Sequence, residues 1–257
     1  MTDIIVLVLF ALGSYMFGNI NWAIIISKSK NKDIRTMGSG NPGTLNMSRN
    51  LGLKFGLLTF FLDIMKGVIP TLAVFFVFKG KTFVNTQFLI SDFAIYLCGF
   101  FVVMGHIYPV VFKFKGVKGI ASTIGVFLVC ESVYGIEWAV IIIMALVAAL
   151  VFIYLTEFGA MGSFIAITPP AIASLIRLFN VYGNYRFAVA PATTVVYVIT
   201  NMLVFAICFF TWFAHRRNIE RMLSGDEHPT SIKEMVVKMK AKKMLKAQEE
   251  KSKNSID

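Results

Sequence analysis

The sequence predicts an all-α, polytopic integral membrane protein with about seven transmembrane helices. The chain of 257 residues is 57% hydrophobic and has a mean hydropathy of +0.72, which is too apolar for a soluble domain. It also contains several apolar runs of the ~20 residues that a helix needs to cross a hydrocarbon core. Because these runs do not alternate apolar and polar residues, they favour helices over a transmembrane β-barrel.

Six apolar runs are long enough to span the membrane alone: 4–26, 55–78, 91–112, 137–155, 160–178 and 193–214. A seventh run, from 119 to about 133, is shorter and is interrupted by Ser122, Thr123 and Gly125, so we expect a tilted or re-entrant helix there. No basic region precedes the first run and no small-residue cleavage site follows it, so it is expected to be a retained helix rather than a signal peptide.

The distribution of basic residues predicts the orientation of the chain. Seven spans place the termini on opposite sides, and a cytoplasmic C-terminus puts 20 of the 25 Lys and Arg residues on the inner side. Four basic residues then fall outside, Lys79, Lys81, Arg177 and Arg186, while Lys66 lies within a span. The net charge of +11 is thereby explained by orientation and by anionic lipid headgroups, and no nucleic-acid partner is predicted.

Two domains are expected, a membrane-embedded domain over residues 1–228 and a basic cytoplasmic tail over 229–257. The tail is either an amphipathic segment on the membrane surface or a disordered one. The three cysteines, Cys98, Cys130 and Cys208, lie inside apolar runs without paired spacing. The sequence therefore predicts neither a disulfide framework nor a metal site, and no cofactor is expected.

A polar, glycine-rich loop after the first apolar run carries the strongest functional signal. It contains Gly38, Gly40 and Gly43 together with Asn41 and Asn46. Glycine adopts positive φ angles easily, so several N–H groups can turn toward one point and form an anion-binding concavity. A phosphate group would fit such a concavity, although an ordinary turn between membrane helices would have a similar composition.

A second loop of the same kind, Lys113 to Gly119, precedes the seventh apolar run. Its N–H groups are expected at a helix N-terminus, where anions are favoured. The predicted orientation places both loops and the segment around His215 on the cytoplasmic face. The sequence therefore predicts a composite site for two phosphorylated ligands.

Other polar residues lie within or beside the apolar runs. Asp63 and Lys66 can neutralise each other at a spacing of i, i+3, and we expect a structural ion pair because burying either alone is costly. His106 lies just ahead of the second loop, and Asn218 follows His215 by three positions on one helical face. The sequence contains no nucleotide P-loop, G-x-S-x-G elbow or H-x-x-x-x-D box, so a covalent mechanism is not predicted.

Three motif regions carry a family resemblance: G-S-G-N-P-G-x-x-N-x-x-R-x-L-G (38–52) with D-x-x-K-G (63–67), G-H-x-Y-P-x-x-x-x-F-K-G-x-K-G-x-A (105–121), and H-R-x-N-I-x-R-x-L-x-G-x-E (215–227). In order and spacing they resemble the bacterial acyl-phosphate:glycerol-3-phosphate acyltransferases, the PlsY family, over roughly residues 4–228. The resemblance implies a seven-helix enzyme of the bacterial plasma membrane with its active site facing the cytoplasm. Such an enzyme makes lysophosphatidic acid and phosphate from acyl phosphate and glycerol 3-phosphate, and its functional partner is the enzyme that supplies acyl phosphate.

The resemblance also implies roles for individual residues. The residues expected to act in catalysis are Arg49, Lys118, His215 and Asn218. Those expected to contact substrate or phosphate are Ser39, Gly40, Asn41, Gly43, Thr44, Asn46, Lys115, Gly116, Gly119 and Ser163. The residues expected to hold the site residues in place, without contacting substrate, are Asp63, Lys66, His106 and Glu227.

The chain departs from the family pattern at residues 156–163. The family's Thr-Arg-Tyr-x-Ser-x-x-Ser segment is replaced by Thr-Glu-Phe-Gly-Ala-Met-Gly-Ser, so that Glu157 stands in place of the arginine and only Ser163 remains of the two serines. Two alternatives stay open from the sequence. One is a membrane carrier for an organic phosphate, and the other is a degenerate homologue without catalytic activity.

Overall fold

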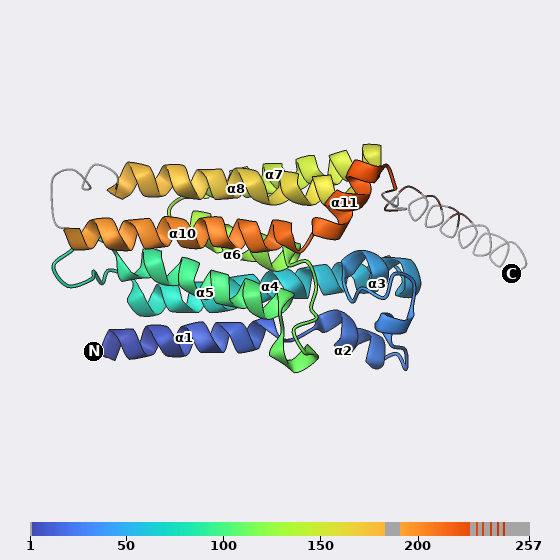
Figure 1. Ribbon diagram of the computed structural model, residues 1–257, viewed down its shortest axis with the longest axis horizontal. Helices are drawn as coiled ribbons and strands as arrows, with labels where there is room; N and C mark the ends of the chain where they lie inside the picture. Colours follow the sequence, from blue (N-terminus) through green and yellow to red (C-terminus); the bar gives the residue numbers. More distant parts are fainter. Residues whose placement is uncertain are drawn as a thin grey trace, which may run out of the picture.

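The computed structural model describes residues 2–182 and 191–226, together with Thr230, Lys233, Val237, Ala241 and Met244. Long helices lie side by side, and three short ones, α2, α3 and α11, gather at one end (Figure 1). The elements are α1 (Thr2–Gly18), α2 (Trp22–Lys28), η1 (Ile34–Thr36), α3 (Thr44–Leu51), α4 (Leu53–Phe78), α5 (Ile90–Ile107), η2 (Val110–Phe112), α6 (Ile120–Ser132), α7 (Ile136–Thr156), α8 (Gly159–Tyr182), α10 (Pro191–Phe213) and α11 (Arg216–Ser224).

The predicted all-helical membrane class is confirmed. Five of the described helices, α4, α5, α7, α8 and α10, are long and apolar enough to cross a membrane. The pair α1 and α2 meets the same criteria together, whereas α6 has only 13 residues. The count of seven spans and the orientation of the termini therefore stay predictions.

The first predicted span, 4–26, is not one continuous helix. The chain bends by 41° between α1 and α2, after Gly18. Asn21 causes a new helix start there, because its side chain accepts a hydrogen bond from the N–H of Ile24 at 3.0 Å and caps α2. Lys66 stabilises the break from α4, since its ammonium group donates to the freed carbonyl of Ile20 at 2.5 Å.

Glycines set the closest helix crossings in the bundle. Where α4 crosses α6, a Cβ placed on Gly67 would lie 2.2 Å from the carbonyl oxygen of Ser122, so no larger residue fits. Where α1 crosses α5, a Cβ on Gly105 would lie 2.1 Å from the carbonyl oxygen of Tyr15. Since lipid gives helices little hydrophobic reason to associate, such close backbone contacts supply packing energy.

A cluster of buried charged side chains lies at the end of the bundle opposite the short helices. Arg177 of α8, which the charge distribution assigns to the outer side, is only 3% exposed and is thus a buried residue of the helix bundle. Its guanidinium donates from Nη2 to the Tyr96 hydroxyl at 2.8 Å and lies 3.9 Å from Asp92 Oδ2 and 3.8 Å from Glu131 Oε2. The hydroxyl of Tyr182 also donates to Asp92 at 2.6 Å. Arg186 lies outside the described residues.

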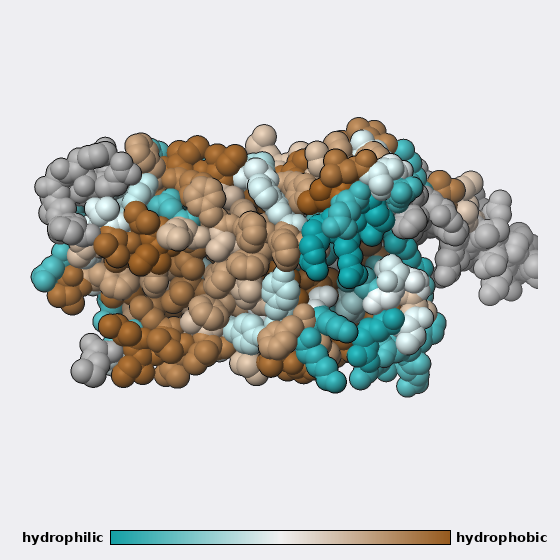
Figure 2. Space-filling model, in the orientation of Figure 1, coloured by the Kyte–Doolittle hydropathy of each residue, from teal (hydrophilic) through white to brown (hydrophobic). Residues whose placement is uncertain are grey.

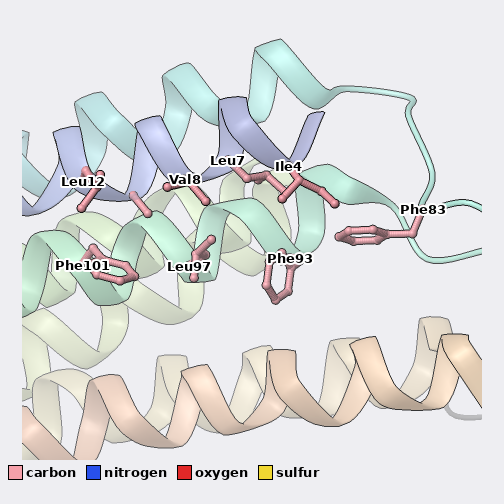
Figure 3. A pocket seen from close by; sticks show the side chains of 9 residues that line it. Ile4, Leu7, Val8, Leu12, Phe83, Phe93, Leu97 and Phe101 are labelled. Atoms are coloured by element: carbon pink, nitrogen blue, oxygen red, sulfur yellow. The ribbon is translucent and has the colours of Figure 1, made fainter. Parts of the chain in front are cut away.

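An apolar groove of about 340 Å³ lies between α1 and α5 near the N-terminus (Figure 3). Its lining is entirely apolar: Ile4, Leu7, Val8, Ala11, Leu12, Phe83, Phe93, Leu97 and Phe101. The groove is at the opposite end of the bundle from the glycine-rich loops. It suits hydrocarbon chains and is not the candidate site for a charged ligand.

Candidate active site

Hydrophilic residues gather at one end of the molecule. Figure 2 shows the teal surface over the region of α2, α3 and α11, while the middle and the other end are mostly brown. Both glycine-rich loops connect elements at this end, because the first runs from η1 to α3 and the second from η2 to α6. The polar end therefore contains the candidate site residues of both loops.

The first loop adopts the backbone that its glycines predict. Gly38 and Gly40 have φ angles of 54° and 69°, whereas Gly43 is extended at −133°. Gly43 is the N-cap of α3 and offers no side chain to the first turn of that helix. The N–H groups that begin α3, among them those of Thr44 and Leu45, therefore point out of an uncapped helix N-terminus.

Asn46 holds the first loop in shape from inside. It is 2% exposed, and its amide nitrogen donates to the carbonyls of Ile34 and Met37 at 3.2 and 2.9 Å. Its amide oxygen accepts the N–H of Ser39 at 3.2 Å and an amide hydrogen of Asn50 at 2.9 Å. The side chain is thus used in bracing the loop, so a direct contact of Asn46 with substrate stays a prediction.

The second loop folds back onto the end of α5. The N–H groups of Gly116 and Val117 donate to the carbonyls of Ile107 and His106 at 3.1 and 3.2 Å. A Cβ on Gly116 would lie 2.2 Å from the carbonyl oxygen of His106, so this approach requires glycine. Gly119, with a φ of 83°, then begins α6 without a side-chain cap. The start of α6 therefore offers a second uncapped helix N-terminus.

The two loops are in contact. A Cβ placed on Gly43 would lie 3.1 Å from Cγ1 of Val117. Lys118, the next residue, is half-buried and acts electrostatically on His215. The arrangement brings two helix N-termini, a lysine and a histidine to one place. Both helix N-termini and the lysine would stabilise an anion held there.

His215 lies at the break between α10 and α11, just after the predicted last span 193–214. It is 1% exposed, its Nδ1 lies 2.9 Å from the carbonyl oxygen of Thr211, and its ring packs 5.7 Å from that of Phe164. Because a carbonyl only accepts, Nδ1 carries the hydrogen and Nε2 keeps its lone pair. Burial, and then the nearby charge of Lys118, lower the pKa of His215 to about 4. The imidazole is thus neutral at pH 7. Asn218, buried in the first turn of α11, follows it.

The predicted ion pair of α4 is present and extends to a third residue. Lys66 Nζ lies 3.0 Å from Asp63 Oδ1 and 2.7 Å from His106 Nδ1. Since an ammonium group only donates, His106 accepts at Nδ1 and its hydrogen is on Nε2. All three side chains are at most 6% exposed. Together they tie α4 to the bend after α1 and to the end of α5, onto which the second loop folds.

Arg49, Ser163, Lys115 and Glu227 were also predicted to belong to the site. Arg49 is exposed, and its Nε and Nη2 donate to the backbone carbonyl of Thr230 at 3.1 and 2.6 Å. The hydroxyl of Ser163 donates to the carbonyl of Gly159 within its own helix at 2.8 Å. Lys115 is exposed in the second loop. Glu227, like most of the predicted tail, lies outside the described residues.

Sequence reasoning missed three residues that contact this site. Thr230 binds Arg49, Phe164 packs on His215, and Thr211 fixes the tautomer of His215. Thr211 lies four residues before His215, so helical spacing could have indicated it. Thr230 and Phe164 come from distant parts of the chain, and no local pattern indicates their contacts.

A bundle of apolar helices with two uncapped helix N-termini and a cationic polar end defines an integral membrane protein suited to an anionic ligand. The family model described as "Glycerol-3-phosphate acyltransferase" matches residues 8–225. The chain therefore belongs to the glycerol-3-phosphate acyltransferase family, and it is an enzyme of the acyltransferase class.

Individual relatives agree with this assignment over most of their length. The chain is 35% identical to the glycerol-3-phosphate acyltransferase of Mycoplasmopsis pulmonis, over 85% of this chain and 90% of the relative. It is also 35% identical to that of Aquifex aeolicus, over 86% and 96%. Two crystal structures of PlsY (YgiH), an integral membrane glycerol 3-phosphate acyltransferase, are similar in fold. The glycerol 3-phosphate form has a TM-score of 0.60 at 28% identity and the lysophosphatidic acid form 0.64 at 29%, each over 87% of this chain and 94% of the other.

Proposed function

We propose that this protein transfers an acyl group from acyl phosphate to glycerol 3-phosphate and releases 1-acyl-sn-glycerol 3-phosphate and inorganic phosphate. The acceptor is supported by the names of the relatives and by the glycerol 3-phosphate and lysophosphatidic acid forms of PlsY. The observation that carries the proposal is the contact between the two loops, which brings two uncapped helix N-termini together. Both substrates carry a phosphate, so a pair of anion sites suits them.

The reaction can proceed by direct attack, without a covalent intermediate on the protein. A hydroxyl of glycerol 3-phosphate attacks the acyl carbonyl carbon, an ester C–O bond forms, and the C–O bond to the phosphate breaks. Inorganic phosphate then leaves with the hydroxyl proton. Because acyl phosphate is already activated, placing the two substrates and compensating their charge account for the required rate acceleration.

The environment of His215 supports phosphate as the proton acceptor. Its pKa of about 4 makes the imidazole a weak base at neutral pH. A phosphate monoester such as glycerol 3-phosphate has a second pKa of about 6, so a substrate phosphate oxygen is a stronger base than this imidazole, and the proton ends on the inorganic phosphate that is released. On this reading Nε2 of His215 accepts a hydrogen bond from the hydroxyl and orients it, while Lys118 and Arg49 compensate the phosphate charge.

The experiment is a product assay with purified protein. With acyl phosphate and glycerol 3-phosphate we expect inorganic phosphate and lysophosphatidic acid in equal amounts, and we expect no product when acyl-CoA replaces acyl phosphate. Lys118→Ala, which removes one cation from the second loop, is the low-activity control. Product from acyl-CoA, or none from acyl phosphate in a sample shown to be folded, would contradict the proposal.

The same preparation tests a carrier. In proteoliposomes, uptake of labelled glycerol 3-phosphate without lipid product would favour the carrier. We place the reaction at the cytoplasmic face of a bacterial plasma membrane, as the first acylation of phospholipid synthesis, with an enzyme that makes acyl phosphate as the functional partner. Growth of a strain lacking this acyltransferase step, once it expresses this chain, tests that placement.

A further inference from the structure

Arg49 is held by a residue that lies beyond the part of the chain matched by the family model. The match ends at residue 225, and the carbonyl of Thr230 accepts two hydrogen bonds from the guanidinium, 3.1 Å from Nε and 2.6 Å from Nη2. Thr230 is 4% exposed, although Arg49 itself is exposed. The carbonyl of a buried residue thus fixes one edge of an exposed side chain.

Thr230 is itself fixed at the corner between α7 and α8. Its N–H donates to the carbonyl of Glu157 at 3.1 Å, and the N–H of Lys233 donates to Glu157 Oε1 at 3.2 Å. Lys233 Nζ also donates to the carbonyl of Leu155 at 2.9 Å. A Cβ on Gly159 would lie 2.9 Å from the methyl group of Thr230, so the corner leaves room for Thr230 only because residue 159 is glycine.

The anchoring residue Glu157 is one of the positions at which the chain departs from the family pattern. Glu157 stands where that pattern has an arginine, and both its backbone and its side chain accept hydrogen bonds from the segment after α11. An arginine has no acceptor in its side chain, so it could not bind the N–H of Lys233. The altered corner and the extension beyond residue 225 therefore form one structural feature.

We propose that Glu157 and Thr230 are positioning residues that orient Arg49 toward the phosphate of a substrate. The proposal rests on the proposed function, in which Arg49 compensates phosphate charge. A backbone carbonyl is uncharged, so it leaves the positive charge of Arg49 available. It occupies one edge of the guanidinium, and the Nη1 edge keeps the donors that a phosphate requires.

The test uses full-length variants with matched controls. Thr230→Pro removes the N–H that binds Glu157, whereas Thr230→Ser keeps it. Glu157→Ala removes the side-chain acceptor for Lys233, whereas Glu157→Gln keeps an amide oxygen there. We expect Thr230→Pro and Glu157→Ala to raise the KM for glycerol 3-phosphate about tenfold, with a smaller change in kcat, because a charged hydrogen-bonding group loses its orientation. The two control variants should stay within about twofold of the unchanged enzyme.

A double-mutant cycle separates positioning from a general structural role. In an Arg49→Ala background, adding Thr230→Pro should raise KM no further, because the side chain that it orients is absent. Additive losses, or no effect of Thr230→Pro and Glu157→Ala on KM, would overturn the proposal. A lower KM in these variants would also overturn it and would identify the contact as inhibitory.

A second readout keeps this inference separate from the proposed function. If the unchanged protein forms no product, the proposed function fails, and binding of glycerol 3-phosphate is then measured by calorimetry in the same variants. A tenfold weaker affinity in Thr230→Pro, with no further loss beside Arg49→Ala, supports positioning. Equal affinities in all variants, or no binding by the unchanged protein, overturn it.

Discussion

Two buried clusters of charged side chains stabilise opposite ends of the bundle by different means. At the loop end, Asp63 and Lys66 balance each other's charge, and the ammonium group also binds the backbone carbonyl of Ile20. At the far end, two carboxylates face the single guanidinium of Arg177 at 3.8 and 3.9 Å. The far cluster joins side chains of α5, α6 and α8, whereas the loop-end cluster holds a helix bend. We infer that the far cluster maintains the packing of the helices, whereas the loop-end cluster also maintains the shape of the site.

Arg177→Leu is expected to have the largest effect on stability. It leaves Asp92 and Glu131 buried without a cation and removes the donor to the Tyr96 hydroxyl. Removing one partner from a buried ionic cluster costs about 3–5 kcal/mol of unfolding free energy. We expect that loss in a denaturation series, with kcat/KM per folded molecule unchanged.

The neighbouring residue provides the control for Arg177. Ile176 is 49% exposed on the outer surface of α8, so Ile176→Leu should leave the unfolding free energy unchanged. Wild-type stability in Arg177→Leu would show that the far cluster does not hold the helices. A loss of kcat/KM in the folded fraction would show that the two ends are coupled.

Lys66→Met should combine a smaller loss of stability with a loss of activity. The substitution leaves Asp63 uncompensated and frees the carbonyl of Ile20, for a cost of about 3 kcal/mol. It also removes the partner of His106, whose carbonyl binds the N–H of Val117 in the second loop. We therefore expect kcat/KM of the folded fraction to fall, unlike the result for Arg177→Leu.

Adding a second substitution tests whether charge or shape is responsible. Asp63→Asn combined with Lys66→Met removes both charges, so it should recover part of the unfolding free energy. Activity should stay low, because the bond to His106 is still missing. A double variant with full activity would contradict the idea that this cluster shapes the second loop.

Within the polar end, cations should matter more than the histidine. Lys118→Ala and Arg49→Ala remove charge compensation for phosphate, and losing such a preorganised group costs about 100-fold in rate. His215→Gln should cost only about tenfold, because in the proposed mechanism its weakly basic imidazole orients the hydroxyl and does not take its proton. Rates of the three folded variants are compared at saturating acyl phosphate. If His215→Gln is the slowest of the three, phosphate is not the proton acceptor.

The contrast between the clusters also explains what the sequence could predict. Asp63 and Lys66 lie one helical turn apart in a single apolar run, so their spacing indicates an ion pair. Arg177 reaches partners 85 and 46 positions away in the chain, at Asp92 and Glu131, and no local period connects these residues. Its position near the end of the predicted span 160–178 therefore indicated a side of the membrane but none of these partners.

The same limit applies to the candidate site. The positive φ angles of Gly38 and Gly40 and the uncapped start of α6 follow from local sequence, and they were predicted. The bend after Gly18 was not, because a single asparagine within an apolar run does not indicate a break, and the contact of Lys66 with Ile20 comes from a distant helix. The partner of Arg49 could not be predicted either, since Thr230 is 181 residues away.

The smallest predicted effect concerns the pH dependence of stability at His215. Its pKa is about 4 in the folded protein, because of burial and of Lys118, and about 6.5 in the unfolded chain. The unfolded state therefore binds a proton first as pH falls, so stability is lost between pH 6.5 and 4. Between pH 8 and pH 6 this linkage amounts to about 0.8 kcal/mol. From pH 8 to pH 6, the unfolding free energy of His215→Gln should fall by about 0.8 kcal/mol less than that of the unchanged protein, because glutamine does not titrate. Equal pH dependence in both proteins would mean that His215 is not held neutral beside Lys118, and the argument for phosphate as the stronger base would then fail.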